Sequence, residues 1–250
     1  MDIIIPMIDG RGQVDSLGIR GNAIECVALA AASVGKEAFS QYQQEVMKLI
    51  LELAEAEKLN DDPRTKPLSR CWGNFAKILG EDFKPYFGQI LPRLLGAAAR
   101  KPNIRLVGMD HPEDETGWKY MIIDNRKKIA YEDGSVELRE AAFNMLYWIA
   151  KLNAEIIQPH ISQILPICVS SFDFVFNTDV RTSSASASCN MLEIISRTEE
   201  PAVVQAAAGQ IFQGLVQALL KESDKEVILV QIDCLHEVSS SPSSIGSVSD

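Results

Sequence analysis

Apolar residues recur every three to four positions through most of the chain, which is the spacing of one face of an α-helix. The first such run covers residues 17–34 and is followed by Gly35, where a helix C-cap is expected. A second run, 39–56, continues with the same spacing. The pattern therefore predicts two helices separated by a glycine break.

Later runs predict more helices, which pair in chain order. The predicted pairs are 68–79 with 83–99, 136–152 with 157–172, and 179–196 with 202–220. A single helix at 224–238 follows without a partner, and alternation with a period of two is confined to 118–123. The chain is thus predicted to be almost wholly α-helical.

The helix pairs repeat about every 44 residues. Segment 83–92 shares five identical residues with segment 157–166, an offset of 74 that equals one period plus an insertion of about 30 residues. Repeats of about 40–47 residues are typical of HEAT proteins, whereas ankyrin and tetratricopeptide repeats are about ten residues shorter. The sequence predicts an all-α HEAT-repeat α-solenoid of about five antiparallel helix pairs.

This array is predicted to cover 1–238, with the insertion at 100–135. Residues 239–250 are rich in serine and are predicted to be disordered. Residues 1–8 resemble the tail of a second helix, and both terminal helices carry apolar rather than polar faces. Since terminal repeats of a solenoid need polar outer faces, we expect the array to be incomplete at both ends and to be part of a longer one.

Four segments carry a resemblance to a known family: 17–26 (LGIRGNAIEC), 33–39 (SVGKEAF), 75–83 (FAKILGEDF) and 114–118 (DETGW) in the insertion. With these, the chain resembles the importin-beta (karyopherin-beta) family of nuclear transport receptors, in particular its importin-five branch. The resemblance implies a segment of a receptor that binds basic cargo proteins, the GTPase Ran and phenylalanine–glycine nucleoporins. It also implies shuttling between cytoplasm and nucleus through the nuclear pore, with cargo and Ran bound by the second helices.

Composition agrees with basic protein partners. Lys and Arg total 24 and Asp and Glu 34, so the net charge is -10 and the isoelectric point is near 4.9. This excess disfavours nucleic acid, which requires a basic surface, and favours basic partners. The most apolar stretch, 23–34, contains Glu25, so no membrane span is predicted. Five cysteines without a CxxC pair indicate a reducing compartment.

Two groups of carboxylates are candidate contacts for cargo or Ran. Glu45, Glu52 and Glu55 share a helical stripe with Lys48, and spaced carboxylates can pair with Lys or Arg of an extended peptide. The alternative is a solvated helix face carrying a Lys48–Glu52 pair.

The second group lies in the insertion. It comprises Asp110, Glu113, Asp114 and Glu115, ahead of a hairpin predicted from the alternation at 118–123 and a turn near residue 124. Such a long loop either contacts a partner or is a connection folded onto neighbouring helices. Trp118 and Tyr120 are expected to anchor this loop rather than to contact a ligand.

Three arginines, Arg20, Arg139 and Arg181, each follow an apolar residue near the start of a helix pair. In HEAT proteins such arginines often bond an acidic or amide side chain of the neighbouring repeat. Asp173 and Asn177 are the candidate partners. This predicts a structural ladder rather than a binding site.

No feature of the sequence predicts an enzyme. P-loop, HExxH, GxSxG and GxGxxG patterns are absent, and the three histidines are too far apart to share a metal. His160 is expected to pack, because Tyr86 stands at its place in the related segment. We therefore predict no catalytic, cofactor-binding or metal-ligating residue. The alternative function is a HEAT-repeat scaffold for a multiprotein complex such as a phosphatase assembly, but such scaffolds usually lack a long insertion.

Overall fold

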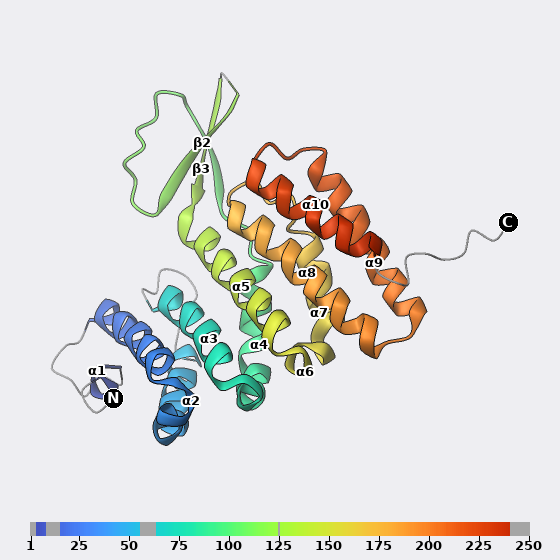
Figure 1. Ribbon diagram of the computed structural model, residues 1–250. Coiled ribbons are helices and arrows are strands. Elements are labelled where there is room, and N and C mark those ends of the chain that lie inside the picture. Colours follow the sequence, from blue (N-terminus) through green and yellow to red (C-terminus); the bar gives the residue numbers. More distant parts are fainter. Residues whose placement is uncertain (1–3, 9–15, 56–63, 125, 241–250) are drawn as a thin grey trace.

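The computed structural model describes residues 4–8, 16–55, 64–124 and 126–240. Its helices form two layers (Figure 1). The first layer runs through the first half of α2 and through α3, α5, α8 and α10. These elements are α2 (Leu17–Glu55), α3 (Thr65–Leu79), α5 (Asp133–Leu152), α8 (Thr178–Thr198) and α10 (Lys225–Ser240). Successive members of this row pack side by side.

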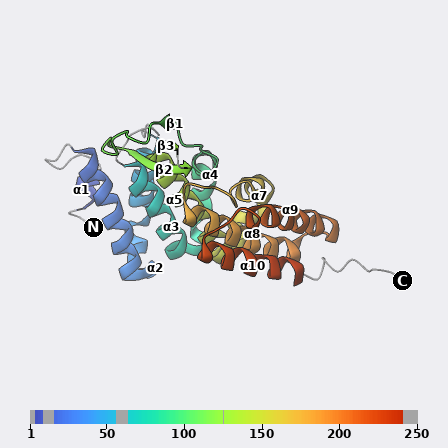
Figure 2. The same cartoon turned by 90° about the horizontal axis from the view of Figure 1, so that it is seen from above.

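The second layer holds the return helix of each pair. It consists of the second half of α2 and of α4 (Lys84–Ala98), α7 (Ile161–Val169) and α9 (Pro201–Leu219). Figure 2 shows α4, α7 and α9 along one side of the row of first helices. The predicted solenoid of antiparallel helix pairs is confirmed.

The glycine break at residue 35 is confirmed as well. Gly35 has φ 80° and ψ 170°, a left-handed conformation that side chains with a Cβ rarely adopt, so α2 is two helices joined at this residue. Lys36 then donates to the Leu79 carbonyl oxygen at 3.0 Å and pairs with Asp82 at 2.8 Å. These bonds tie the turn of the first pair to the turn of the second.

A continuous hydrophobic core joins the pairs from Ile5, in the short helix α1 (Ile5–Ile8), to Val238. Phe39 is fully buried and its ring lies 5.6 Å from that of Phe75 in the next pair. The His160 ring lies 5.6 Å from that of Phe87, so the expectation that this histidine packs is confirmed. Each fully buried aromatic or aliphatic side chain contributes about 1.5–3 kcal/mol to folding.

The predicted single helix at 157–172 is wrong in detail. The chain instead forms α6 (Ala154–Ile157), the 3-10 turn η2 (Gln158–His160) and α7. Pro159 explains the interruption, because its ring restricts the preceding residue and removes a backbone donor. A comparable 3-10 turn, η1 (Gly80–Phe83), precedes α4.

The insertion folds into a three-stranded antiparallel sheet beyond one end of α5 (Figure 1). Its strands are β1 (Ile104–Val107), β2 (Trp118–Asp124) and β3 (Lys127–Glu132), in the order β1-β3-β2. The predicted hairpin corresponds to β2 and β3, and β1 was not predicted. The Tyr131 ring packs against that of Phe176 in a tilted arrangement, with centroids 4.7 Å apart, and so joins the sheet to the loop before α8.

Two further predictions concern membrane-spanning segments and the two ends of the sequence. By length and mean hydropathy alone, α2 and α9 are apolar enough to cross a membrane, which corrects the expectation that no segment qualifies. However, α2 is broken at Gly35, and α9 packs on α7, α8 and α10, as second helices of a solenoid do. The serine-rich tail beyond Ser240 and residues 1–3 lie outside the described residues.

Candidate protein-binding surface

The three stripe carboxylates lie on the second half of α2. Glu45, Glu52 and Glu55 are all exposed, whereas Met47 and Ile50 on the opposite side of the helix are buried. The helical period places them along one solvent-facing stripe. The helix therefore presents acidic side chains to any partner that approaches this layer.

Lys48 partly neutralises that stripe. Its ammonium lies 3.9 Å from a carboxylate oxygen of Glu52, one turn further along the helix. Both side chains are more than half exposed, so this pair contributes only about 0.3–0.5 kcal/mol. A basic partner residue can therefore displace Lys48 at little cost.

Acidic residues of the second layer are confined to α2. Helices α7 and α9 contain no charged side chain, and α4 contains only Lys84 and Arg93. Their exposed polar positions are mostly glutamines: Gln89, Gln163, Gln205, Gln210, Gln213 and Gln217. In this layer the acidic side chains are thus limited to α2, and they are followed by the two basic residues of α4 and by the uncharged amide surface of α7 and α9.

Two of the four carboxylates in the insertion are used to fold it. Glu113 pairs with Lys128 at 3.1 Å, and Lys128 also donates to the His111 carbonyl oxygen at 2.7 Å. Since the side chain of Lys128 is only 3% exposed, its charge requires such partners. Glu115 pairs with Arg105 at 2.8 Å.

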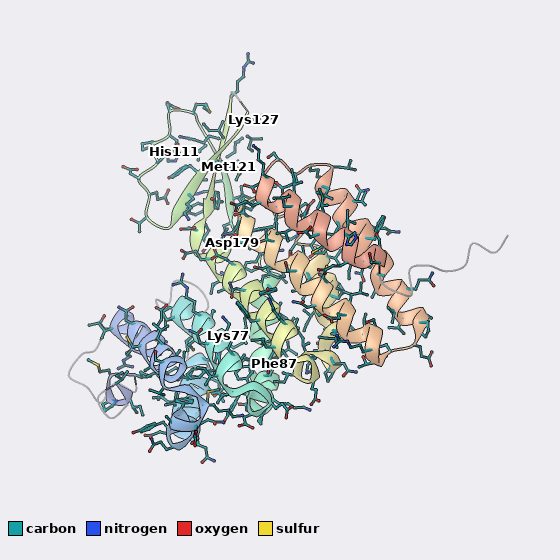
Figure 3. The ribbon with its side chains drawn as sticks, viewed as in Figure 1. Lys77, Phe87, His111, Met121, Lys127 and Asp179 are labelled. Atoms are coloured by element: carbon teal, nitrogen blue, oxygen red, sulfur yellow. The ribbon has the colours of Figure 1, made fainter. Side chains whose placement is uncertain are left out.

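The loop that carries these carboxylates is held against one face of the sheet. The Arg105 guanidinium lies 3.4 Å from the ring centroid of Trp118, and the His111 ring lies 5.9 Å from that of Tyr120. Figure 3 labels His111 in this loop. Trp118 and Tyr120 thus contact residues of their own insertion, while Asp110 and Asp114 remain exposed.

The stripe and the insertion are two separate candidate surfaces. Figure 1 places the sheet beyond the end of α5, whereas α2 lies at the first end of the array. A single short peptide segment therefore cannot contact both of these surfaces at once. A partner that contacts both has to extend along the solenoid.

Two of the three predicted arginines are buried and bond neighbouring elements, but with partners other than those expected. Arg139 donates to the Arg100 carbonyl oxygen at 2.9 Å and to the Ser171 hydroxyl at 2.7 Å. Its guanidinium also lies 4.2 Å from the ring centroid of Phe174. Burial among these neutral groups lowers its pKa from the ordinary value.

Arg181 pairs with Glu222 at 2.6 Å, and both side chains are less than a tenth exposed. The two expected partners bond elsewhere, which corrects the prediction: Asp173 pairs with Lys221 at 2.9 Å, and Asn177 donates to Glu140 at 2.8 Å. Both arginines do contact the turn before α8, but at Phe174: Arg181 donates to its carbonyl oxygen at 2.9 Å, and Arg139 lies over its ring. For Arg20 the ladder stays a prediction.

A polar groove of about 310 Å³ lies between α2, α3 and α5, on the first-helix layer. Glu25 and Arg70 on its wall pair at 3.6 Å. Lys77, labelled in Figure 3, lies 3.7 Å from the ring centroid of Trp148, and desolvation lowers its pKa. Sequence analysis missed this groove, because its residues come from three helices and share no local pattern.

Among the described residues, no group of three or more His, Cys, Asp or Glu side chains is placed to hold a metal ion. Burial raises the pKa of the Cys168 thiol to about 12 and raises that of Cys71 well above its usual value. Thiols that stay protonated in this way are poor nucleophiles.

No family model matches the sequence. Importin subunit beta-3 of Saccharomyces cerevisiae (strain ATCC 204508 / S288c) is 23% identical over 218 residues, which are 83% of this chain and 20% of that protein. A probable importin-5 homolog of Dictyostelium discoideum is 27% identical over 153 residues, which are 61% of this chain and 14% of that protein. The homologues of this chain are thus importin-beta family members. The chain spans about a fifth or less of the length of these importins.

Solved structures of the karyopherin Kap121p share the fold. Kap121p bound to Pho4p superposes with a TM-score of 0.78 at 21% identity, over 96% of this chain and 23% of that one. Kap121p bound to RanGTP gives 0.76 at 20% identity, over 96% and 23% of the two chains. Kap121p bound to Nup53p gives 0.77 at 21% identity, over 96% and 22%. This likeness establishes the solenoid fold.

Proposed function

We propose that the chain is a segment of a nuclear transport receptor that binds basic cargo proteins and contributes to import regulated by Ran-GTP. The observation that carries the proposal is the likeness to importins and to Kap121p, which covers nearly the whole chain. Kap121p itself has been solved with Pho4p, RanGTP and Nup53p. The partners proposed for this chain are accordingly basic cargo proteins, Ran and phenylalanine–glycine nucleoporins, with shuttling between cytoplasm and nucleus.

Recognition of cargo rests on charge and on extended shape. The net charge of -10 raises the encounter rate with basic segments. Glu45, Glu52 and Glu55 then pair with Lys or Arg side chains of the cargo. The glutamines of α7 and α9 offer amide donors and acceptors to an extended peptide backbone without favouring either charge.

Release of cargo follows from the mechanics of the array. Each helix pair contacts only its neighbours, so small rotations between pairs change the curvature of the whole solenoid. If Ran-GTP binds one curvature more tightly than another, it shifts the population toward that curvature. Carboxylates on separate elements, such as Glu52 on α2 and Asp110 in the insertion, then no longer match one extended ligand.

The test uses the immobilised 250-residue chain and three ligands: a Lys-rich peptide, Ran-GTP and Ran-GDP. The expected result is retention of the peptide at low salt, weaker retention at physiological salt, and greater retention of Ran-GTP than of Ran-GDP. Replacing Glu45, Glu52 and Glu55 by Gln is expected to weaken peptide retention, since it removes the charges that pair with lysine.

The matched control changes the same number of exposed charges elsewhere. Glu81, Glu155 and Glu226 are exposed and lie on other elements, so the variant Glu81→Gln, Glu155→Gln, Glu226→Gln alters net charge equally. Equal retention of the peptide by both triple variants would reject the stripe on α2. Failure of the chain to retain any of the three ligands would reject the proposed function.

A further inference from the structure

The sheet of the insertion has an open edge at β1. In the order β1-β3-β2, β1 pairs only with β3, and the register places Ile104 opposite Tyr131. The Glu132 amide donates to the Asn103 carbonyl oxygen at 3.0 Å, so Asn103 and Glu132 form a hydrogen-bonded pair. Opposed residues along an antiparallel ladder alternate between hydrogen-bonded and non-hydrogen-bonded pairs, so Ile104 and Leu106 belong to non-hydrogen-bonded pairs. Ile104 and Leu106 therefore point their N–H and C=O groups away from β3.

Both residues that carry these outward groups are exposed. Ile104 is 53% exposed and Leu106 is 72% exposed. Among the residues that the structure describes, none forms a backbone hydrogen bond with Ile104 or Leu106 on the outward side. We call the outward backbone groups of Ile104 and Leu106, with their side chains, the β1 edge. Unpaired edges of this kind are templates for a further strand.

The two faces next to the β1 edge differ in chemistry. Ile104 and Leu106 lie on the same face as Tyr131, which packs on Phe176, so this side is apolar. On the other face, Arg105 is neutralised by Glu115. A strand added at this edge would alternately meet apolar side chains and the face that carries the acidic loop.

That loop begins directly after β1 and presents exposed carboxylates at Asp110 and Asp114. The side chain of Lys127, by contrast, stands at the tip of the β2–β3 hairpin and points away from the sheet (Figure 3). Since Arg105 on the edge strand is already paired with Glu115, the carboxylates of Asp110 and Asp114 are the exposed charges of this loop that are complementary to a basic strand. A second copy of this chain would bring a further charge of -10 to the same place, which disfavours pairing between copies.

We propose that the β1 edge binds an extended peptide with alternating basic and apolar residues, which adds to the sheet as a fourth strand. Backbone bonds to Ile104 and Leu106 supply part of the affinity, and the alternate side chains supply selectivity. The inference rests on the proposed function in that the ligand is a basic segment of a partner protein. It assigns that segment to a site separate from the stripe on α2.

The test measures fluorescence anisotropy of a labelled eight-residue peptide in which Lys and Val alternate, titrated with the 250-residue chain. A second probe is the same peptide with alternate backbone amides methylated, which blocks one edge of the peptide. The variant Leu106→Pro removes the outward N–H of the β1 edge but no ladder bond, because proline is tolerated where the N–H of an edge strand faces solvent. Leu106→Ala is the control that shortens the side chain and keeps the N–H.

Peptide affinity is expected to fall about tenfold in Leu106→Pro and for the methylated probe, and to fall less in Leu106→Ala. Amide hydrogen exchange of Ile104 and Leu106 is expected to slow when the peptide binds to the unmodified chain. This second measurement does not depend on a variant that folds. Unchanged affinity in Leu106→Pro, equal binding of the methylated probe, or unchanged exchange would each overturn the proposal.

Two further outcomes separate this inference from the proposed function. If the Gln triple variant at Glu45, Glu52 and Glu55 loses the peptide while Leu106→Pro keeps it, the β1 edge is wrong and the stripe on α2 is supported. If the chain self-associates and Leu106→Pro abolishes that association, a second copy occupies the edge and the assignment of a basic peptide is overturned.

Discussion

Buried polar side chains hold this molecule together at the points where its repeats change direction. Arg139 joins α5 to the Arg100 carbonyl and to Ser171 after α7. Gln231 on α10 donates to the Phe172 carbonyl oxygen at 2.8 Å, and Asn153 donates to the Ala76 carbonyl oxygen at 3.2 Å. The Arg100 and Phe172 carbonyls lie outside the helix ladders and gain a donor in this way, whereas the Ala76 carbonyl lies at the end of α3 and also accepts from the Gly80 amide. These side chains position turns rather than bind ligands.

Replacing Arg139 by Ala should therefore cost much of the stability of the fold. We expect the free energy of unfolding to fall by about 2–4 kcal/mol, because the Arg100 carbonyl and the Ser171 hydroxyl lose their donor and a buried side chain leaves a void. Urea denaturation followed by circular dichroism measures this loss. The control is Arg197→Ala, whose ion pair with Glu193 is exposed and is expected to contribute less than about 1 kcal/mol. Equal losses in the two variants would show that Arg139 holds no network.

The sequence predicted which arginines matter but not what they bond. Their place after an apolar residue near the start of a helix pair is a local signal, and Arg139 and Arg181 are indeed buried. The partners depend on the path of the turn before α8, which no local pattern encodes. Likewise the stripe of Glu45, Glu52 and Glu55 could be read from helical spacing. The ion pairs that occupy Glu113 and Glu115 could not, because they form only when the loop folds onto the sheet.

At the scale of elements, the period of the apolar residues predicted the helices, and Pro159 interrupts one of them. Helices predicted from long runs with a period of 3.6 lie close to their observed bounds, and Gly35 correctly predicted the break in α2. Strand β1 was missed because four residues carry too little alternation to distinguish a strand from a loop. The polar groove between α3 and α5 was missed because it arises from packing, which the spacing within one helix does not record.

The sheet behaves as an attached element that depends on Tyr131. Tyr131 is 7% exposed and its ring packs against that of Phe176, so Tyr131→Ala removes the aromatic contact between β3 and the loop before α8. We expect amide hydrogens of β3 to exchange faster in this variant, while those of α8 keep their protection. Hydrogen exchange followed by mass spectrometry measures both.

A matched control for this prediction is Tyr147→Ala. Tyr147 is only partly buried on α5, and its ring stacks edge-on to that of Trp148, away from the sheet. Exchange in β3 should be unaffected by that change. If Tyr131→Ala instead raised exchange in α8 and β3 equally, the sheet would be an integral part of the helical core.

At the scale of the whole molecule, a continuous core and an uneven distribution of charge together define what the solenoid can bind. The core links all the helix pairs that the structure describes, so recognition has to come from their exposed faces. Acidic side chains gather on the second half of α2 and in the insertion loop, whereas α4 carries only Lys84 and Arg93, and α7 and α9 carry no charge. A ligand that fits is extended, basic in parts and neutral in others. This description suits an extended basic peptide better than a folded acidic surface.

The most direct test of the central claim is the salt dependence of peptide binding by the 250-residue chain. The dissociation constant of a fluorescent Lys-rich peptide is measured by anisotropy from about 50 to 200 mM salt, a range over which the screening length shortens appreciably. The account predicts binding that weakens steadily with salt, and no binding of a Glu-rich peptide of the same length. Affinity for the Lys-rich peptide that does not change with salt, or equal affinity for the acidic peptide, would contradict it.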